Sequence, residues 1–539
     1  GIELLDLRFK RINYSEIVRR DIYLSMISER QKERDRYRSE GQGEAAEING
    51  QMTRELLTIN STASMKVKKI EGEADANATA IYAEAYNNRG VALRDLGQLE
   101  VAVNSYNRAI ELKPDYVEAH SNLIFTQDFL SNIDLIQQQK ERQLWDQRFI
   151  QPLQKYHSPH PNQADAERLL RIGYLSADFR RHSAAQGFAD LILSYDAKQF
   201  QVYCYSGVGI QQEDELTVSF QHQASVWRAT KGLTDIDLVE QIRHDQIDIL
   251  VDLSGHTAGN RLLTLGYKPA PIQVSGIGHN PPGLSTVDYR LTNRFSTFPE
   301  EESLFPEQPI YLDYATGFHL YQMQLAVSPL PAKGNGFLTF GCLNRWAKVS
   351  STTLALWVRL LLAIPNSRLI LKASQLANES LRSSILGQMK ASGVSEERID
   401  LRGGTSQQQH LAVYQEIDIS LDPFPHGGGI TSLESVWMGV PVISLYGDRV
   451  ASRAGATTLC PLRLGDWVVA GESEYIELAQ DWSQRLGELE QLRSDLRPRV
   501  EEQAKVFPGQ VEEGYRRIWQ RWCRGEKASP LNLAKTEKK

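Results

Sequence analysis

"DISLDPFPHGGGITSLESVWMGVPVISLYG", residues 418–447, predicts a strand, a glycine loop, a helix and a second strand in succession. Thr431 and Glu434 stand three residues apart and match a capping box, which would make Thr431 a helix cap and the three glycines a plain turn. The loop is neither a Walker A motif nor a GxGxxG fingerprint. A helix that begins with bare backbone N–H groups also suits an anion such as a diphosphate. The stretch therefore predicts two strands joined by a helix, with a candidate phosphate site at the helix start.

Apolar strands alternate with helical segments from about Arg168 onward. The predicted strands are "LRIGYLSAD", "QVYCYSG", "IDILVDLSG", "IQVSGIG", "LTFGCLN", "RLILKA", "IDLR", "DISLD" and "PVISLYG". This alternation is typical of parallel sheets covered by helices on both faces, and residues 322–336 predict a linker between two such units. The fold class is therefore α/β, with two doubly wound lobes and a cleft between them. We expect a last helix to pack back across the lobes through Val511, Tyr515, Ile518, Trp519 and Trp522.

The first 82 residues have a different character. They contain no proline, and a short alternating stretch, "LLDLRFKRI", is followed by a long charged run. This pattern predicts one strand and then a long helix that is solvated or self-associating.

A repeat follows this helix. The phrase "AEAYNNRGVALRDLGQLEVAVNSYNRAIELKPDY", residues 83–116, restarts as "VEAHSNL" at the thirty-four-residue period of tetratricopeptide helix pairs. Its small residues, turn and end stand where such pairs have them: Gly90, Ala92, Leu96, Gly97, Tyr106, Ala109 and Pro114. One full repeat and part of another cannot bury a continuous face, so we expect the pair to pack on a neighbouring domain.

Composition restricts the classes of partner that we expect this protein to bind and the cellular compartment in which we expect it. Lys plus Arg total 60 against 67 for Asp plus Glu, and this net charge of −7 gives no general electrostatic reason to bind a nucleic acid. The four cysteines lie too far apart for a CxxC-type zinc site and predict reduced, buried thiols in a cytoplasmic protein. The most apolar window, "LALWVRLLLAIP", is too short to span a bilayer. Because the chain begins at Gly1, membrane association is expected only if an upstream anchor is missing from the sequence.

Three separated motifs resemble one family of enzymes. They are "DLSGHTAGNRLLTLGYKPAPIQVSGIGHNPPGLSTVDYRLTN", "FGCLNRWAKVSSTTLALWVRLLLAIPNSRLIL", and the glycine loop with "GDRVASRAGAT". Together they resemble the catalytic region of O-linked N-acetylglucosamine transferases, the O-GlcNAc transferase/SPINDLY family, over residues 83–525. The resemblance implies an inverting, metal-independent glycosyltransferase of the two-lobed glycosyltransferase-B type, preceded by tetratricopeptide repeats.

The resemblance also implies catalytic roles. Lys348, in "NRWAKVS", matches the lysine that contacts the sugar-nucleotide diphosphate and stabilises charge on the leaving group. Arg345 stands where animal members have a glutamine near the same phosphates, and it would add a second positive donor. His182, in "SADFRRHSAAQGF", matches a histidine at the lobe interface once proposed as a general base.

The same resemblance implies which residues bind the nucleotide. His410 matches the histidine that stacks near the uracil, while Gln407 replaces its companion lysine. The remaining nucleotide-sugar positions fall on the glycine loop and helix start, with the carboxylate at the ribose: Gly428, Gly429, Thr431, Ser432 and Glu434. Animal members have His-Thr-Thr where this chain has Gly429, Ile430 and Thr431, which leaves donor preference open.

A third group of residues is expected in the cleft or on its acceptor side. His256 and Thr257 follow the strand "ILVDLSG", where open sheets place ligands, and His279 lies in "GHNPPG". The resemblance implies UDP-GlcNAc as donor and a protein as acceptor, with no other cofactor. No acidic DxD pair occurs in the hydrophobic setting that would present a metal, so none is expected.

The first 82 residues carry a second resemblance. "ELLDLRFKRINYSEIVRRDIYLSMISERQKERDRYRSEGQGEAAEI" and "IEGEADANATAIYAEAY" resemble the end of the band-7 domain and the following helix of HflC-type proteins, in the stomatin/prohibitin family of membrane-protease modulators. The phrase "AEAYNN" suits both this segment and the repeat that follows it. The junction is therefore where a natural fusion or a chimera would have joined two genes.

We expect six segments: an HflC-like strand and helix (1–82), a tetratricopeptide repeat (83–135), a helical linker (136–167), an N-terminal catalytic lobe (168–330), a C-terminal nucleotide-sugar lobe (334–525) and a disordered tail (526–539). The first functional hypothesis is transfer of N-acetylglucosamine from UDP-GlcNAc to Ser or Thr hydroxyls of proteins. The second is a related transferase that uses another nucleotide sugar, such as a fucosyl donor, or an Asn acceptor. The third is a non-catalytic scaffold that assembles beside a membrane protease through residues 1–82.

Overall fold

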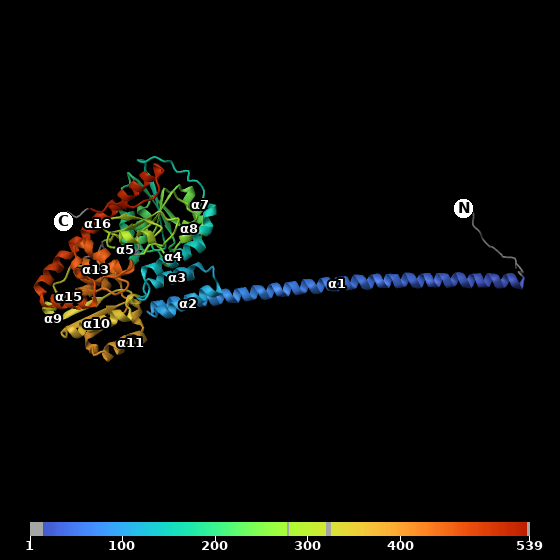
Figure 1. Ribbon diagram of the computed structural model, residues 1–539, viewed down its shortest axis with the longest axis horizontal. Helices are drawn as coiled ribbons and strands as arrows, with labels where there is room; N and C mark the ends of the chain where they lie inside the picture. Colours follow the sequence, from blue (N-terminus) through green and yellow to red (C-terminus); the bar gives the residue numbers. More distant parts are fainter. Residues whose placement is uncertain (1–14, 277–279, 320–324, 536–539) are drawn as a thin grey trace. The chain divides into compact units, whose positions relative to one another are not determined.

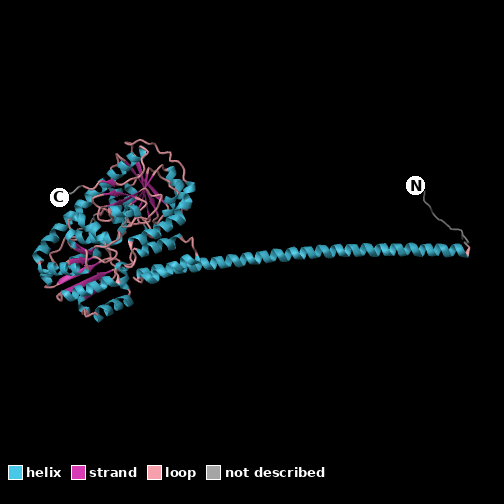
Figure 2. Cartoon of the chain, in the orientation of Figure 1, coloured by secondary structure: helices cyan, strands magenta, loops and turns pink. Residues whose placement is uncertain are grey.

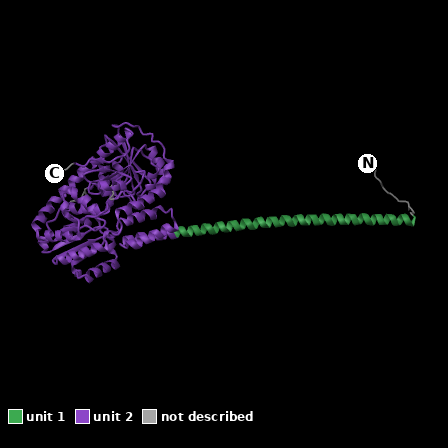
Figure 3. Cartoon of the chain, viewed as in Figure 1, with its two compact units in different colours: residues 1–81 green, residues 82–539 purple. Residues whose placement is uncertain are grey.

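The computed structural model describes residues 15–276, 280–319 and 325–535. The chain divides into two compact units, residues 1–81 and residues 82–539, coloured separately in Figure 3. Within the described ranges, no helix is both long enough and apolar enough to cross a membrane.

The first unit is helical throughout its described part. Helix α1 (Glu16–Asp95) passes through it and carries its side chains exposed up to residue 78, including Ile48 and Ile59 at 63% and 61% exposure. The predicted long helix is thereby confirmed (Figure 1). The predicted strand "LLDLRFKRI" lies outside the described residues.

The second unit begins with packed helices: the last turns of α1, then α2 (Leu99–Leu112), α3 (Val117–Gln127) and α4 (Leu135–Trp145). A Cβ atom on Gly90 would lie only 2.5 Å from the Tyr106 ring, so a glycine is what lets α1 and α2 approach so closely. Asn122 donates a hydrogen bond to Asn87 Oδ1 at 2.9 Å, which ties α3 to the same helix. The helical repeat predicted from the small residues is confirmed in this arrangement.

The N-terminal lobe is built on an eight-stranded parallel sheet in the order β14-β7-β6-β5-β4-β1-β2-β3. Its strands are β1 (Leu170–Ser176), β2 (Phe200–Ser206), β3 (Val226–Ala229), β4 (Ile249–Asp252), β5 (Ile272–Ser275), β6 (Tyr289–Thr292), β7 (Gln308–Tyr311) and β14 (Leu531–Asn532). Its own helices are α5 (Ser183–Leu193), α6 (Glu215–Gln223), α7 (Asp235–His244) and α8 (Leu262–Gly266). Separate apolar cores cover the two faces, with α5 and α6 in one and α7 and α8 in the other.

The C-terminal lobe is built on a six-stranded parallel sheet in the order β10-β9-β8-β11-β12-β13. Its strands are β8 (Leu338–Cys342), β9 (Ser367–Lys372), β10 (Ile399–Arg402), β11 (Ile419–Leu421), β12 (Val442–Leu445) and β13 (Val468–Val469). Its helices are α9 (Pro331–Asn335), α10 (Ser351–Ala363), α11 (Glu379–Ala391), α12 (Gln407–Ala412), α13 (Ile430–Trp437), α14 (Ala454–Leu459) and α15 (Glu472–Gln484). Figure 2 shows the strands of both sheets in magenta among cyan helices, and the α/β fold class with two parallel sheets is confirmed.

Helix α16 (Leu486–Cys523) joins the two lobes through their cores. Leu489, Leu496 and Val500 lie in the core of the C-terminal lobe, whereas Phe507 and Trp519 lie in the core of the N-terminal lobe. The predicted return of the last helix is confirmed. Burial of apolar side chains in two cores by one helix fixes where the lobes meet.

The prediction of a disordered tail over residues 526–539 is wrong for its described part. Leu531 pairs with Ile310 at the edge of the N-terminal sheet, and the backbone N–H of Lys535 donates to Asp313. A polar, lysine-rich composition suggested disorder, but one buried leucine and the ladder hydrogen bonds are enough to add a short edge strand.

The cysteines are free thiols, as expected. Cys204 and Cys342 are buried, and burial raises the pKa of the Cys342 thiol to about 12. Cys460 and Cys523 are only half-buried, which corrects the expectation that all four are buried.

Candidate functional site

A cavity of about 870 Å³ lies between the two lobes. The loops that follow β1, β2, β3, β4 and β5 line one side, and the start of α13 with the loop after β8 lines the other. Seven of the predicted site residues line it: His182, His256, Thr257, Arg345, Lys348, Gly429 and Thr431. Four others lie behind its wall: His410, Gly428, Ser432 and Glu434. His279 lies outside the described residues.

Asp422, at the end of β11, holds the glycine loop in place through hydrogen bonds. This buried carboxylate accepts hydrogen bonds from the Gly428 N–H at 2.7 Å and from the Ser444 hydroxyl at 2.8 Å. A Cβ atom on Gly428 would lie 2.3 Å from Ser432 Oγ, and one on Gly427 would lie 2.8 Å from Asp422 Oδ2. These glycines are therefore required by close packing on Asp422. The only local signal for this carboxylate in the sequence is its place at the end of a predicted strand.

Helix α13 begins at Ile430, with Gly429 as its cap residue and no side-chain cap. The capping box expected between Thr431 and Glu434 is therefore wrong, because Thr431 is the second helical residue. The N–H groups of Gly427 and Gly428 donate to Ala451 and Asp422, so within the described part of this loop and helix the N–H groups left for a ligand are those of the first helical turn. Because these N–H groups carry the positive end of the helix dipole, the cavity meets an anion-binding surface there.

Ser432 does not face the cavity. It is 2% exposed and its hydroxyl lies 3.3 Å from Asp422 Oδ1, to which it donates. Thr431, by contrast, lines the cavity, and its carbonyl accepts a hydrogen bond from the Tyr414 hydroxyl at 3.1 Å. Of the two predicted hydroxyls, only Thr431 is therefore in a position to touch a bound ligand.

Lys348 crosses from the loop after β8 to the glycine loop. Its Nζ donates to the carbonyl oxygen of Gly427 at 2.7 Å. Burial lowers the pKa of Lys348 to about 8, against the opposing effect of the nearby Asp422 carboxylate and with a smaller lowering by Arg345. The ammonium is therefore charged at neutral pH. It lies beside the start of α13, where an anion other than Asp422 would pair with it.

Arg345 and His182 face the cavity from opposite lobes. Desolvation lowers the pKa of Arg345, with a further lowering by Arg94 from the end of α1. Burial also lowers the pKa of His182, so its ring is neutral at pH 7 although Asp178 lies 3.5 Å away. The His182 Nδ1 atom caps α5 by accepting from the Ala184 N–H at 3.3 Å. Because Nδ1 accepts from the Ala184 N–H, we assign the ring proton to Nε2.

His410 belongs to a cluster behind the cavity wall. The Nζ atom of Lys372, at the end of β9, donates to His410 Nδ1 at 3.1 Å, and His410 Nε2 lies 3.4 Å from Glu434 Oε2. Lys372 is 4% exposed, and burial lowers its pKa. This lysine was missed from the sequence, where Gln407 occupies the position expected for a cation. The only available signal was its place at the carboxyl end of a predicted strand.

His256 is held by the helical repeat. Its Nε2 donates to the Pro282 carbonyl at 3.0 Å, and its Nδ1 lies 3.2 Å from the Ser121 hydroxyl of α3. Burial lowers the pKa of His256 to about 3, so the ring is neutral and both nitrogens are engaged. Thr257 donates its hydroxyl to the Ser254 carbonyl at 2.7 Å. Both residues shape the wall of the cavity rather than offering a free polar group.

The helical repeat also contacts the glycine loop itself. The Phe129 ring, in the turn after α3, stacks on His426 with centroids 4.8 Å apart and planes 23° apart. His426 Nδ1 in turn lies 2.9 Å from the Gly427 carbonyl, the oxygen that accepts from Lys348. Nearby, Arg142 and Asp128 form a buried bidentate pair at 2.9 Å. The predicted packing of the repeat on a neighbouring domain is therefore confirmed. The repeat packs on the part of the lobes that lines the inter-lobe cavity.

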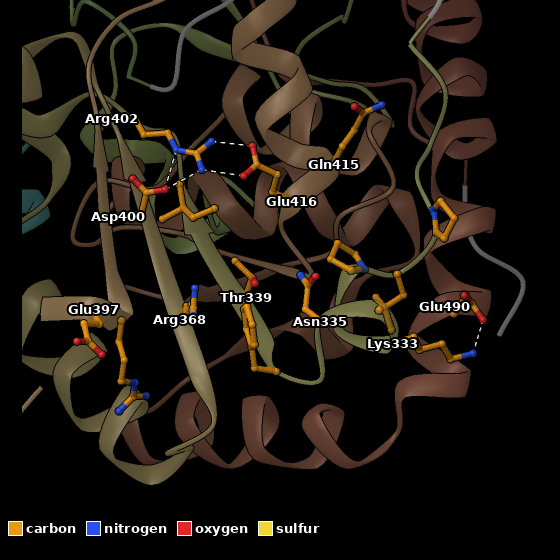
Figure 4. Close-up of a pocket in the computed structure, with 17 residues that line it drawn as sticks. Lys333, Asn335, Thr339, Arg368, Glu397, Asp400, Arg402, Gln415, Glu416 and Glu490 are labelled. Atoms are coloured by element: carbon orange, nitrogen blue, oxygen red, sulfur yellow. Dashed lines mark hydrogen bonds and ion pairs between the residues drawn. The ribbon is translucent and has the colours of Figure 1, made fainter. Parts of the chain in front are cut away.

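A second cavity, of about 710 Å³, lies on the C-terminal lobe and contains none of the predicted site residues. Figure 4 shows Arg402 paired with Asp400 and Glu416, and Lys333 paired with Glu490. Its charges are therefore compensated within its own wall.

Among the described residues, no group of three His, Cys, Asp or Glu side chains lies close enough together to hold a metal ion. The expectation of metal-independent chemistry stays a prediction.

Comparison with known proteins identifies what the chain resembles. The family described as glycosyl transferase family 41 matches residues 137–325 and 329–509, and a TPR repeat matches residues 90–123. The mutant O-GlcNAc transferase of Thermobaculum terrenum, a solved structure, is 33% identical with a TM-score of 0.77, covering 82% of this chain and 85% of that one.

Two plant relatives agree with this match. The protein named "Probable UDP-N-acetylglucosamine--peptide N-acetylglucosaminyltransferase SPINDLY" from Oryza sativa subsp. japonica is 34% identical over 438 residues, which are 79% of this chain and 47% of the rice protein. Its namesake from Arabidopsis thaliana is 34% identical over 405 residues, 73% of this chain and 44% of that protein. The chain thus spans about half the length of the curated relatives it matches.

Proposed function

Because the chain belongs to glycosyltransferase family 41, we propose that it transfers N-acetylglucosamine from UDP-GlcNAc to Ser or Thr hydroxyls of an acceptor protein. The names of the rice and Arabidopsis relatives and of the Thermobaculum terrenum enzyme support this donor and this class of acceptor.

One observation carries the proposal. A buried, charged lysine, Lys348, lies 2.7 Å from the carbonyl of Gly427, where the first N–H groups of α13 open into an inter-lobe cavity. A cation and a helix N-terminus that converge at one point suit a diphosphate, which carries the charge that develops when a nucleotide sugar is cleaved. A cavity of about 870 Å³ is also large enough for a nucleotide sugar.

The mechanism we propose is a single displacement with inversion. The acceptor hydroxyl oxygen attacks the anomeric carbon as the bond from that carbon to the β-phosphate oxygen breaks, and UDP leaves with the bonding electrons. Lys348, Arg345 and the start of α13 stabilise the charge on the diphosphate, and no metal ion is required for this step. The hydroxyl proton passes to a base or to solvent. His182, whose Nε2 carries the ring proton, orients a reactant as a hydrogen-bond donor.

We assign the nucleotide end of the donor to the cluster of His410, Lys372 and Glu434, which shares helix α13 with the cavity residue Thr431. The buried lysine beside His410 supplies the cation that the sequence lacks at Gln407. Glu434 would accept from a ribose hydroxyl, since its carboxylate oxygens are hydrogen-bond acceptors and Oε2 lies 3.4 Å from His410 Nε2.

Calorimetry and a transfer assay test the proposal together. We expect the full chain to bind UDP more tightly than GDP, and to move labelled N-acetylglucosamine from UDP-GlcNAc to a Ser/Thr peptide. Preference for GDP and transfer from GDP-fucose would assign the related fucosyl-type reaction instead. Labelling that resists β-elimination would assign an Asn acceptor, and absence of nucleotide binding would leave only the non-catalytic scaffold.

For residues 1–82 we propose self-association. Apolar side chains recur on α1 at intervals of eleven residues: Met26, Tyr37, Ile48, Ile59, Ile70 and Ile81. An eleven-residue period keeps one stripe in line along a helix and supports packing against a second helix of the same period. Sedimentation of the full chain should report a smaller particle for Ile48→Glu with Ile59→Glu, and an unchanged one for the exposed neighbour Thr58→Glu. An unchanged particle in the first variant would make the helix passive.

The HflC-type resemblance of residues 1–82 supports a further proposal, association with a membrane protease. We propose a cytoplasmic location for the transferase lobes, consistent with free thiols throughout. A single transcript that crosses the codons for residues 70–95 in the source organism would establish a natural fusion, and its absence would establish a chimera.

A further inference from the structure

We propose that the acceptor segments of this protein are acidic, and that Arg180 and Lys231 recognise carboxylates next to the accepting hydroxyl. This inference rests on the proposed function, because it names the class of acceptor for the same cavity.

The inter-lobe cavity has an excess of positive charge in a chain whose net charge is −7. Its Lys and Arg residues are Arg94, Arg142, Arg180, Lys231, Arg261, Arg345 and Lys348. Its carboxylates are Asp128, Asp178 and Asp252. The cavity on the C-terminal lobe differs, since its four Lys and Arg residues face four carboxylates. Positive charge is therefore a property of this cavity and not of the protein surface in general.

Most of these cations already have a partner or a role. Arg142 pairs with Asp128, Arg94 with Asp95, and Arg261 lies 3.6 Å from Asp235. Lys348 and Arg345 face the start of α13, where the donor diphosphate is proposed to bind.

Arg180 and Lys231 are the cations left over. Among the described residues, neither side chain forms an ion pair with a carboxylate. Arg180 follows β1 and is half-buried, two residues before His182, whereas Lys231 follows β3 and is exposed. Both belong to the N-terminal lobe, across the cavity from Lys348. Two unpaired cations beside a cavity raise the local concentration of anionic partners.

Sheet geometry sets the spacing that these cations recognise. Strands β1 and β3 are separated by β2, so their ends lie about 10 Å apart at the usual spacing of neighbouring strands. An extended peptide covers that distance in about three residues. We therefore expect Arg180 to meet a carboxylate adjacent to the accepting hydroxyl and Lys231 to meet a second carboxylate about three residues further along the peptide.

Peptide binding tests the inference without requiring turnover. Two fluorescent peptides, each with one central Ser, carry either Glu or Gln at the positions one and four residues from it on the same side. Anisotropy of the full chain loaded with UDP gives a dissociation constant for each peptide. Since exposed charge pairs contribute modestly, we expect the Glu peptide to bind about tenfold more tightly than the Gln peptide.

Variants assign the preference to these two cations. In Arg180→Gln with Lys231→Gln, the ratio of the two affinities should fall to about one, and Lys231→Glu should favour a peptide with Lys at the fourth position from the Ser. Lys198→Gln is the matched control. Lys198 is exposed and precedes β2, at the amino-terminal ends of the strands, whereas the cavity loops follow their carboxyl ends. Retained UDP affinity reports that each variant is folded.

Three results would overturn the inference: equal affinity of the wild-type protein for both peptides, an undiminished ratio in the double variant, or a loss of UDP affinity in place of peptide affinity. The last would assign both cations to the donor. The parallel transfer assay separates this test from that of the function. Transfer to both peptides at equal rates leaves the function standing, whereas selective binding without any transfer leaves the acidic site standing and removes the transferase activity.

Discussion

The Nζ atom of Lys348 lies 2.7 Å from the carbonyl oxygen of Gly427, so the buried ammonium is held directly against the glycine loop. The pKa of Lys348 is lowered to about 8, chiefly by burial. A bound diphosphate stabilises the ammonium, which means that binding takes up a proton at any pH above this value. We expect UDP affinity to be level near pH 7 and to fall as the pH rises through 8, and calorimetry between pH 7 and 9 measures this fall.

Replacing the lysine removes both the affinity and its pH dependence. We expect Lys348→Met to weaken UDP binding by roughly tenfold to a hundredfold, the usual range for a charge-assisted hydrogen bond, and to leave a flat profile between pH 7 and 9. Lys198→Met, far from the cavity, should keep the wild-type profile. A sloping profile in Lys348→Met would assign the titration to another group.

Gly428 is required by its contact with Asp422 and Ser432. Gly428→Ala would place a Cβ atom 2.3 Å from Ser432 Oγ and 2.7 Å from Asp422 Oδ1, so the loop must shift. We expect the free energy of unfolding to fall by about 1–3 kcal/mol and UDP binding to be lost. Gly387→Ala on the exposed face of α11 is the control, because nothing lies within 4 Å of its Cβ position. Helix propensity should make that variant more stable by about 0.5–1 kcal/mol, as chemical denaturation will show.

We expect Lys372 to support the nucleoside end of the donor rather than the diphosphate. We expect Lys372→Met to weaken uridine and UDP by the same factor, about fivefold, because the hydrogen bond that orients His410 is lost. Lys348→Met should weaken UDP alone. Titration of each variant with both ligands decides between the two roles, and Lys390→Met on the surface of α11 should affect neither ligand.

The Phe129–His426 stack links the helical repeat to the glycine loop. Phe129→Leu keeps most of the apolar volume but removes the stacked ring, which contributes about 0.5–1.5 kcal/mol in such pairs. We expect UDP affinity to fall by about threefold, because His426 also contacts the Gly427 carbonyl. Phe149→Leu, elsewhere in the helical region, is the control. Unchanged UDP binding in Phe129→Leu would make the stack a packing contact only.

The longer strands were predictable because their apolar runs stand out from the helices around them. β1 and β2 have seven residues each and β9 has six. The strands missed were β3, β6, β7, β13 and β14: β3, β6, β7 and β14 mix apolar with polar side chains, and β13 is only two valines long. Such strands are stabilised by ladder hydrogen bonds to a sheet that already exists, and a local pattern carries little of that information.

The site was partly predictable for a related reason. Lys348, His182 and Thr431 are carried by recognisable motifs, and the structure brings them to one cavity. Lys372 and Asp422 are fixed by contacts between separate strands, so neither has a local signature. Thr431 does not cap the helix. The Gly428 N–H donates a hydrogen bond to Asp422, and the helix begins at Ile430, one residue before Thr431.

Helix α16 and strand β14 have a consequence for the order in which the protein is made. Phe507, Val511, Tyr515, Trp519 and Leu531 belong to the core that covers one face of the N-terminal sheet. A ribosome releases residues 168–330 long before it reaches these five. The lobe that is synthesised first is thus completed last, and until then one face of its sheet must be shielded by another surface or by a chaperone.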